Sequence, residues 1–163
     1  MKAALKNTGV GSKRSGFELT SYYQLDDQLS IDFEAALTET NLDKSINGSD
    51  EIPGAQKQVF SAGINYQINE RWYTHLRVRK FGDYPLDDNQ SADGSTMVNV
   101  RSAYQFSPQL AVKIDVLNLF NSDDHDVEYF YESQLPTESA PVADRHYHVF
   151  EPRTVRVYLT YNY

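Results

Sequence analysis

Residues 98–121 read VNVRSAYQF-SPQ-LAVKIDVL-NLFN, and this stretch decides the fold prediction. Apolar and polar side chains alternate on both sides of the short segment 107–109, which contains a proline. Strict alternation predicts a half-buried β-strand, and two such runs joined by a tight turn predict an antiparallel hairpin. No part of the stretch has the 3.6-residue period of an amphipathic helix.

The same alternation covers most of the chain. It predicts an all-β fold, an antiparallel up-and-down meander of about seven strands, with no competing helical period. The predicted strands cover residues 17–24, 29–38, 60–68, 72–79, 98–106, 110–116 and 155–163.

The connections between these strands alternate in length. Short turns lie near Asp26, Glu70 and Pro108, and the long connections contain many Gly, Asn, Asp and Ser residues. In a meander, every short turn then lies at one end of the sheet and every long loop at the other. Outer-membrane barrels have this arrangement, which predicts that the sheet is part of a transmembrane β-barrel. The predicted long loops are residues 41–55, 82–95 and 122–151.

A tyrosine recurs on the apolar face of four strands, at a similar height above the short turns. A ring of Tyr and Trp at one depth is typical of the aromatic girdle at a lipid–water boundary. The alternative is cross-strand aromatic packing in a soluble β-sandwich. The many charges on the opposite face favour the girdle. The expected girdle residues are Tyr23, Tyr66, Trp72, Tyr104 and Tyr161.

This interpretation predicts which way each side chain points. An apolar exterior and a polar interior are expected of a membrane barrel. The residues expected to face lipid include Phe33, Ile64, Leu76, Val100, Ile114 and Leu159. The residues expected to face the interior include Glu34, Asn65, Arg77, Arg101, Asp115 and Arg156.

Composition excludes several other classes of protein. The chain has 163 residues, no cysteine and a formal charge of −8, with 15 basic and 23 acidic side chains. Disulfide frameworks and thiolate chemistry are therefore absent, and a nucleic-acid partner is not expected. No apolar run is long enough for a transmembrane helix. Residues 1–15 are predicted to be a flexible lead, whose apolar stretch is too short for an export signal.

Several segments resemble the TonB-dependent outer-membrane receptors. Residues 117–121, LNLFN, resemble the NLFN signature near the end of those receptors. Residues 52–55, IPGA, resemble their IPGAP segment, with Gln56 where proline is usual. Residues 15–19, SGFEL, are similar to one of their strand starts, and residues 151–154, EPRT, resemble the beginning of their closing strand.

The resemblance implies a ligand-gated importer, a barrel of roughly 22 strands plugged by an N-terminal domain. Residues 16–163 then correspond to the C-terminal strands, without the plug or the earlier strands. The implied role is energised uptake of a scarce nutrient, such as a metal chelate of the siderophore kind. The implied location is the bacterial outer membrane, as part of a full-length parent.

The resemblance also implies partners. They are outer-membrane lipid, the remainder of the barrel and its plug, and the TonB complex, reached through the missing N-terminal part. The last implied partner is the barrel-assembly machinery. A final strand that ends on an aromatic residue, here Tyr163, resembles the signal that this machinery recognises.

The sequence contains no catalytic motif, so neither an enzyme nor a cofactor is expected. His146 and His148 share a long loop with several aspartates, but a solvated loop tip explains them more simply than a metal site. The acidic run near Asp87 fails the calcium-loop spacing, because Ala92 stands where a glycine is needed.

The candidate ligand-binding residues form two groups. Four arginines on the polar face are suited to steering an anionic ligand or binding a plug, although pairing with Asp32, Glu34 and Asp115 is favoured because unpaired charges are costly. In the last long loop, aromatic side chains either grip a ligand or belong to strands that extend above the membrane. The candidates are Arg77, Arg79, Arg101, Arg156, Tyr129, Tyr131, His146 and His148.

Two other interpretations remain open. The chain could be a small autonomous β-barrel that binds an apolar ligand, which would require the apolar set to point inward. It could also be a small outer-membrane barrel enzyme, which would require a serine near His146 or His148.

Overall fold

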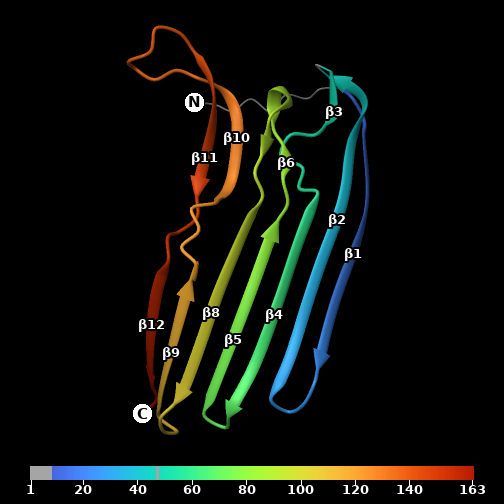
Figure 1. The fold of residues 1–163 in the computed structure, drawn as a ribbon. Coiled ribbons are helices and arrows are strands. Elements are labelled where there is room, and N and C mark those ends of the chain that lie inside the picture. The colour runs from blue at the N-terminus through green and yellow to red at the C-terminus, as the bar shows by residue number, and fades with distance from the viewer. Residues whose placement is uncertain (1–8, 47) are drawn as a thin grey trace.

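The computed structural model describes residues 9–46 and 48–163, and strands dominate them. Seven strands follow one another across the main sheet in chain order, and each neighbouring pair is antiparallel. The predicted up-and-down meander is therefore confirmed (Figure 1). The strands are β1 (Ser12–Gln24), β2 (Leu29–Ile46), β4 (Gln58–Asn69), β5 (Trp72–Phe81), β8 (Ser95–Gln105), β9 (Leu110–Leu117) and β12 (Thr154–Tyr161).

The three long connections contain more strand than predicted. They lie together at the top in Figure 1, opposite the three short turns. The first contains the end of β2 and its partner β3, the second a short pair around a 3-10 helix, and the third a separate hairpin. Their bounds are β3 (Ser49–Glu51), β6 (Tyr84–Pro85), η1 (Asp87–Asn89), β7 (Ser91–Ala92), β10 (His125–Ser133) and β11 (Val142–Val149).

The first strand also begins earlier than predicted. Residues 12–15, which were expected in the flexible lead, pair with β2 from Ser12 opposite Leu42 to Ser15 opposite Glu39. The ladder continues because β2 itself extends to Ile46. Residues 1–8 of the expected lead lie outside the described residues.

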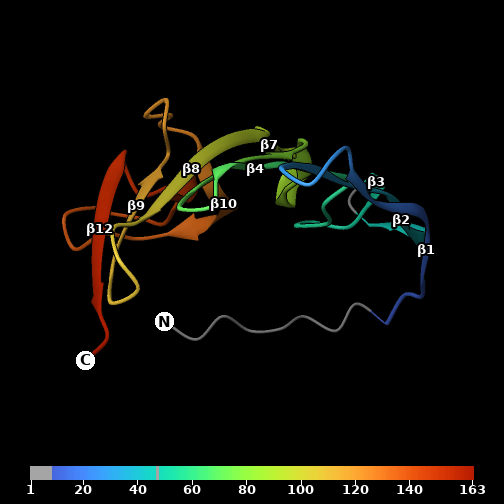
Figure 2. The same ribbon diagram turned by 90° about the horizontal axis from the view of Figure 1, so that it is seen from below.

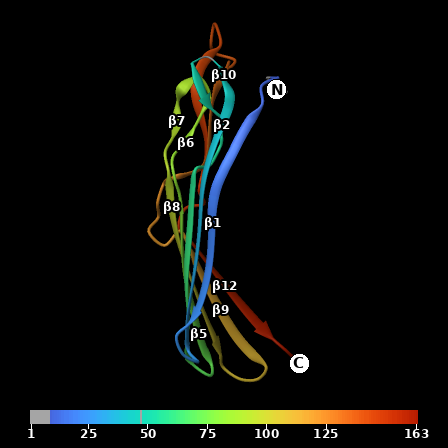
Figure 3. The ribbon, with the colours of Figure 1, turned by 90° about the vertical axis from the view of Figure 1, so that its right-hand side faces the viewer.

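The sheet is a single open layer. Figure 2 shows it curved into an arc, and Figure 3 shows it from the side. Over the described ranges, β1 pairs only with β2, and β12 only with β9. The buried apolar side chains there are Pro85, Leu86, which is 5% exposed, and Ala92, which is 0% exposed, and all three belong to the second long connection. A closed small barrel with an apolar interior has neither feature, so that interpretation does not fit. The described part of the chain also contains no helix long and apolar enough to cross a membrane.

The register divides the sheet into an apolar and a polar face. Directly opposed residues of antiparallel strands share a face. One apolar row crosses all seven strands through Tyr23, Ile31, Ile64, Leu76, Val100, Val116 and Val155. The row beside it is polar and runs through Gln24, Ser30, Asn65, His75, Arg101, Asp115 and Arg156. The two predicted sets of side chains therefore lie on opposite faces.

The tyrosines follow a diagonal across these rows. Relative to the apolar row through Tyr23, the next three tyrosines lie two, four and six residues closer to the short turns, in the third, fifth and seventh strands. In each of these four strands, the last four residues of the apolar face up to and including the tyrosine are apolar, apart from one serine in β1 and one in β8. The sets are Phe17, Leu19, Ser21 and Tyr23; Phe60, Ala62, Ile64 and Tyr66; Val98, Val100, Ser102 and Tyr104; and Val155, Val157, Leu159 and Tyr161.

This stagger gives the tilt of the strands relative to the apolar band. An offset of one residue per strand, with a rise of about 3.4 Å per residue and a strand spacing of about 4.8 Å, corresponds to a tilt of about 35°. Eight residues tilted in this way rise by about 22 Å. Membrane barrels have tilts of about 35–45° and an apolar band of about 25 Å. The stagger therefore supports the interpretation of the tyrosines as an aromatic girdle. Two girdle residues, Trp72 and Tyr104, also pack edge to face, with ring centroids 6.3 Å apart.

Asn118 closes the third long connection onto the sheet. Its side chain is 2% exposed, and its amide donates to the backbone oxygens of Ser122 (2.8 Å) and Glu151 (3.1 Å). Its side-chain oxygen accepts from the Ser122 N–H at 2.8 Å. Asn118 also adopts a φ of 49°, which asparagine tolerates better than most residues. This single side chain explains why an asparagine stands at the NLFN turn.

The assignment of faces predicts the effect of a buried charge. Val100→Lys should lower the free energy of unfolding in phospholipid vesicles by about 2–4 kcal/mol, because it would place an ammonium near the middle of the apolar band. Urea titration followed by tryptophan fluorescence measures the change. Tyr104→Lys at the girdle should cost about 0–1 kcal/mol, and Asn99→Lys on the polar face is the matched control. Equal costs for Val100→Lys and Asn99→Lys would contradict the assignment.

Candidate functional site

Two of the four candidate arginines pair with the acids expected for them. Arg77 lies in β5, and its Nη2 is 2.7 Å from Asp32 Oδ2 in β2, so this ion pair crosses the intervening strand β4. Gly63 of β4 lies beneath it, where a Cβ atom would collide with both side chains. The Arg77 Nη1 also donates to Ser61 Oγ at 2.8 Å.

The second pair joins adjacent strands. Arg101 of β8 lies directly opposite Asp115 of β9. Its Nε and Nη2 donate to Oδ1 and Oδ2 at 2.6 and 2.9 Å, a bidentate pair. Asp115 is 5% exposed, so a partner for its charge is required. Beside this pair, Asn65 Oδ1 lies 2.7 Å from His75 Nδ1.

The other two arginines differ from expectation. Arg156 pairs with Glu151 Oε2 at 2.7 Å, an acid just before its own strand, and not with Asp32, Glu34 or Asp115. The side chain of Arg79 has no hydrogen bond or ion pair within the described residues, and neither does that of Glu34. The favoured interpretation, that all four arginines pair with acids of the polar face, is therefore correct for two of them only.

The aromatic and histidine candidates come together on one face of the β10–β11 hairpin. Tyr129 lies directly opposite His146, and the rings of Tyr131 and His146 stack with centroids 4.0 Å apart. His148 Nδ1 lies 2.9 Å from Asp126 Oδ1. Tyr129 and Tyr131 are 56% and 44% exposed. These residues belong to strands above the main sheet, as one of the two interpretations predicted. The rings of Tyr129, Tyr131 and His148 are exposed and form a strip open to solvent, whereas the Nε2 of His146 is buried.

The opposite face of the hairpin attaches it to the second long connection. Glu128 is 3% exposed. Its Oε1 lies 2.8 Å from His125 Nδ1, and its Oε2 lies 3.3 Å from Arg145 Nη1. Its N–H donates to the Tyr84 hydroxyl at 2.6 Å, and Arg145 also lies 4.0 Å from Asp93. Tyr84 and Asp93 both come from residues 82–95, so Glu128 joins two loops.

The position of Tyr84 between the two loops affects the pKa of its hydroxyl. Burial raises the pKa of its hydroxyl above the usual value of a phenol. The neutral hydroxyl is therefore the form that bonds Glu128, both accepting its N–H and donating to its carbonyl at 3.4 Å. We refer below to Tyr84, Asp93, His125, Glu128 and Arg145 as the loop latch.

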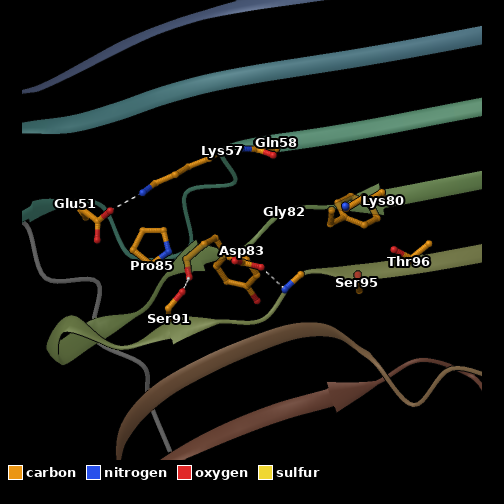
Figure 4. Close-up of a pocket in the computed structure, with 13 residues that line it drawn as sticks. Glu51, Lys57, Gln58, Lys80, Gly82, Asp83, Pro85, Ser91, Ser95 and Thr96 are labelled. Atoms are coloured by element: carbon orange, nitrogen blue, oxygen red, sulfur yellow. Dashed lines mark hydrogen bonds and ion pairs between the residues drawn. The ribbon is translucent and has the colours of Figure 1, made fainter.

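A cavity separates the first two long connections, at the loop ends of β4, β5 and β8. It has a volume of about 480 Å³ and is drawn in Figure 4. Lys57 and Glu51 form an ion pair across its wall. Asp83 Oδ1 accepts the Gly94 N–H at 2.8 Å and holds the base of the second connection. The walls are mostly polar and include Lys80, Ser91, Ser95 and Thr96.

Sequence reasoning missed the loop latch and the cavity. Alternation around Glu128 does not say which face of the hairpin is covered, so the sequence does not distinguish this carboxylate from loop surface. One of the partners of Glu128, Tyr84, lies 44 positions away in the sequence. Within the described ranges, no cluster of three or more His, Asp or Glu side chains is arranged to hold a metal ion.

Comparison with protein-family models matches residues 3–119 to the model described as "TonB dependent receptor-like, beta-barrel". No curated protein sequence matches the chain.

Several solved structures share the fold. The chain is similar to the ferric-catecholate import receptor Fiu of E. coli in its closed form, with a TM-score of 0.73, 15% identity, and coverage of 94% of this chain and 21% of that chain. It is similar to the ferric yersiniabactin uptake receptor FyuA of Yersinia pestis, with a TM-score of 0.72, 20% identity, and coverage of 94% and 24%. It is also similar to the siderophore receptor PiuA of Acinetobacter baumannii, with a TM-score of 0.71, 13% identity, and coverage of 92% of this chain and 22% of that chain. The chain thus spans between 21% and 24% of the length of these three proteins.

The loop latch predicts a difference in local stability. Glu128→Gln removes the counter-charge of Arg145 and should lower the free energy of opening the hairpin by about 1–2 kcal/mol, which is roughly a 5- to 30-fold change in the open population. Trypsin cleavage after Arg145, followed by mass spectrometry, should accelerate by the same factor. Glu132→Gln, on the same hairpin, is the matched control and should leave the rate unchanged. Equal rates for all three proteins would show that Glu128 does not hold the hairpin.

Proposed function

The chain belongs to the TonB-dependent receptor-like β-barrel family, and from this membership we propose that it forms part of the barrel wall of an outer-membrane receptor. The proposed receptor imports a scarce nutrient with energy supplied through TonB. The observation that carries the proposal is the staggered apolar band, four residues deep and displaced by one residue per strand, on a sheet whose opposite face is charged.

The proposal extends to the arrangement of the full receptor. Residues 12–163 supply the C-terminal strands, and the earlier strands and the plug come from the rest of the protein. The polar face then lines the lumen, and the apolar face contacts outer-membrane lipid. The three long connections lie on the extracellular side. TonB acts through the plug-bearing part, and barrel assembly depends on β12 together with the two residues that follow it, Asn162 and Tyr163.

The proposed cargo is a metal chelate of the siderophore kind. Two of the structurally similar proteins support this, since they are import receptors for ferric catecholates and for ferric yersiniabactin. In this chain, the aromatic strip of the hairpin and the arginines of the polar face are the proposed contacts. Exposed aromatic rings suit the planar groups of such chelators, and guanidinium groups suit their anionic oxygens.

The residues proposed to contact the cargo separate into an outer and an inner set. Tyr129, Tyr131, His146 and His148 lie on the extracellular hairpin, where a ligand would arrive. Arg77, Arg79, Arg101 and Arg156 lie on the sheet or at its loop end. A wall segment of this kind binds and guides the cargo and performs no chemistry on it.

An uptake assay tests the proposal. The full-length receptor containing this chain should restore uptake of radioactive iron from at least one ferric siderophore in a host without its own receptors. Uptake should disappear when TonB is absent. Tyr129→Ala with Tyr131→Ala should raise the half-saturating concentration about tenfold, since loss of stacking costs roughly 0.5–1.5 kcal/mol per ring. Leu135→Ala at the exposed hairpin tip is the control. Failure to import any chelate, or import without TonB, would refute the proposal.

The assembly role of the last strand is tested separately. Deletion of Tyr163 from the full-length receptor should lower the amount of folded barrel in the outer membrane, because assembly would lose its terminal aromatic signal. Tyr163 is fully exposed, so its removal breaks no packing contact within this chain. Immunoblotting of outer-membrane fractions measures the effect, and Tyr163→Phe, which keeps the aromatic ring, should behave as the unchanged protein. Normal levels after deletion would contradict the assembly role.

A further inference from the structure

A small hollow on the polar face is positively charged. It has a volume of about 220 Å³ and lies between β5, β8 and β9. Three guanidinium groups line it, together with an imidazole, an amide and one carboxylate. The lining residues are Arg77, Arg79, Arg101, His75, Asn99 and Asp115, with Val100 and Leu117.

The sequence of β4 explains why only one of these arginines lacks a partner. Asp32, Gly63 and Arg77 lie in one row of β2, β4 and β5, and Glu34, Ser61 and Arg79 lie in the parallel row two residues away. In the first row, glycine leaves room for the ion pair to cross above β4. In the second row, the serine side chain occupies that position.

Ser61 is moreover engaged by the first row. It is 8% exposed, and its Oγ accepts a hydrogen bond from Arg77 Nη1 at 2.8 Å. The serine therefore stands between Arg79 and Glu34, and no ion pair joins these two side chains. Because β4 has Ser61 in the second row where it has Gly63 in the first, the Arg79 guanidinium has no ion-pair partner.

Two of the three guanidinium groups that line the hollow have a carboxylate partner, and the third does not. Asp32 neutralises Arg77 at 2.7 Å, and Asp115 neutralises Arg101 through two contacts. Within the part of the chain that the structure describes, the Arg79 side chain forms no ion pair, and Glu34 of the same row lies on the far side of Ser61. A free guanidinium presents a planar fork of donors that matches a carboxylate or a phosphate.

We propose that this hollow is a binding site for the anionic group, carboxylate or phosphate, of a small solute, with Arg79 as its principal contact. A volume of 220 Å³ holds one such group with a few waters, since a water molecule takes about 30 Å³. The inference deepens the proposed function, and it rests on that function in requiring that the polar face line a water-filled passage.

A thiol introduced beside Arg79 tests the site. The chain has no cysteine, and Met97 of β8 lies directly opposite Arg79, so Met97→Cys places a single reporter next to the guanidinium. In the full-length receptor, with any other cysteine replaced by serine, its reaction rates with an anionic sulfonatoethyl and a cationic trimethylammonioethyl methanethiosulfonate are compared in zwitterionic detergent. The ratio of anionic to cationic rate should fall about tenfold when Arg79→Gln is added, because a unit charge about 6 Å away acts on the two reagents in opposite directions.

Further variants identify the cause of that fall. Arg79→Lys, which keeps the charge, should retain most of the ratio. Lys113→Gln removes a cation elsewhere on the polar face, where it lies 4.0 Å from the Tyr158 ring centroid, and should leave the ratio unchanged. Inorganic phosphate should slow the anionic reagent in Met97→Cys at concentrations that have no effect once Arg79→Gln is present.

The outcomes separate the site from the proposed function. If both reagents react with the introduced thiol and Arg79→Gln leaves their ratio unchanged, or if phosphate slows the two proteins equally, the anion site is refuted while the water-filled passage stands. If neither reagent reaches the introduced thiol, the polar face does not line water, and both the passage and the site are refuted.

Discussion

The register of the antiparallel ladder is the constraint on which both faces of this molecule depend. Inside a bilayer, a strand cannot satisfy its N–H and C=O groups with water, so each must bond to the neighbouring strand. A slip of one residue would move every side chain of a strand to the other face. The register seen here aligns Leu76 with Val100 and His75 with Arg101, which keeps apolar and polar rows separate from β1 to β12.

The same register determines which charges meet. Arg101 and Asp115 are neighbours only because β8 and β9 place them opposite each other. Arg77 and Asp32 meet across a whole strand, which only Gly63 permits. Two arginines of the polar face are thus paired with acids by geometry, and Ser61 of β4 stands between Arg79 and Glu34. Above the sheet, the β10–β11 hairpin divides similarly: the Glu128 face is attached to the second connection, and the face with Tyr129 is free.

Period-two alternation was sufficient to predict the seven strands, the positions of the short turns and the separation of the two faces. Boundaries were less accurate, because β1 and β2 continue as a polar ribbon beyond the apolar band, where alternation of hydropathy fades. Ion-pair partners could be predicted only where the acid lies in the neighbouring strand, as for Arg101. Arg156 was misassigned because Glu151 lies in the connection and not on the polar face. The position of Glu128 could not be predicted, since it bonds to Tyr84, which lies far away in the sequence.

The number of strands in the main sheet has a geometric consequence at its two edges. Because seven antiparallel strands lie in chain order, β1 and β12 run in the same direction (Figure 1). Identical copies arranged in a ring with one common orientation would therefore meet in a parallel pair at every junction. Whatever closes this sheet into a fully antiparallel ring must contribute an odd number of strands, and the complete ring then has an even number. The parity of its own strands thus makes the chain unable to complete an antiparallel barrel with rotated copies of itself.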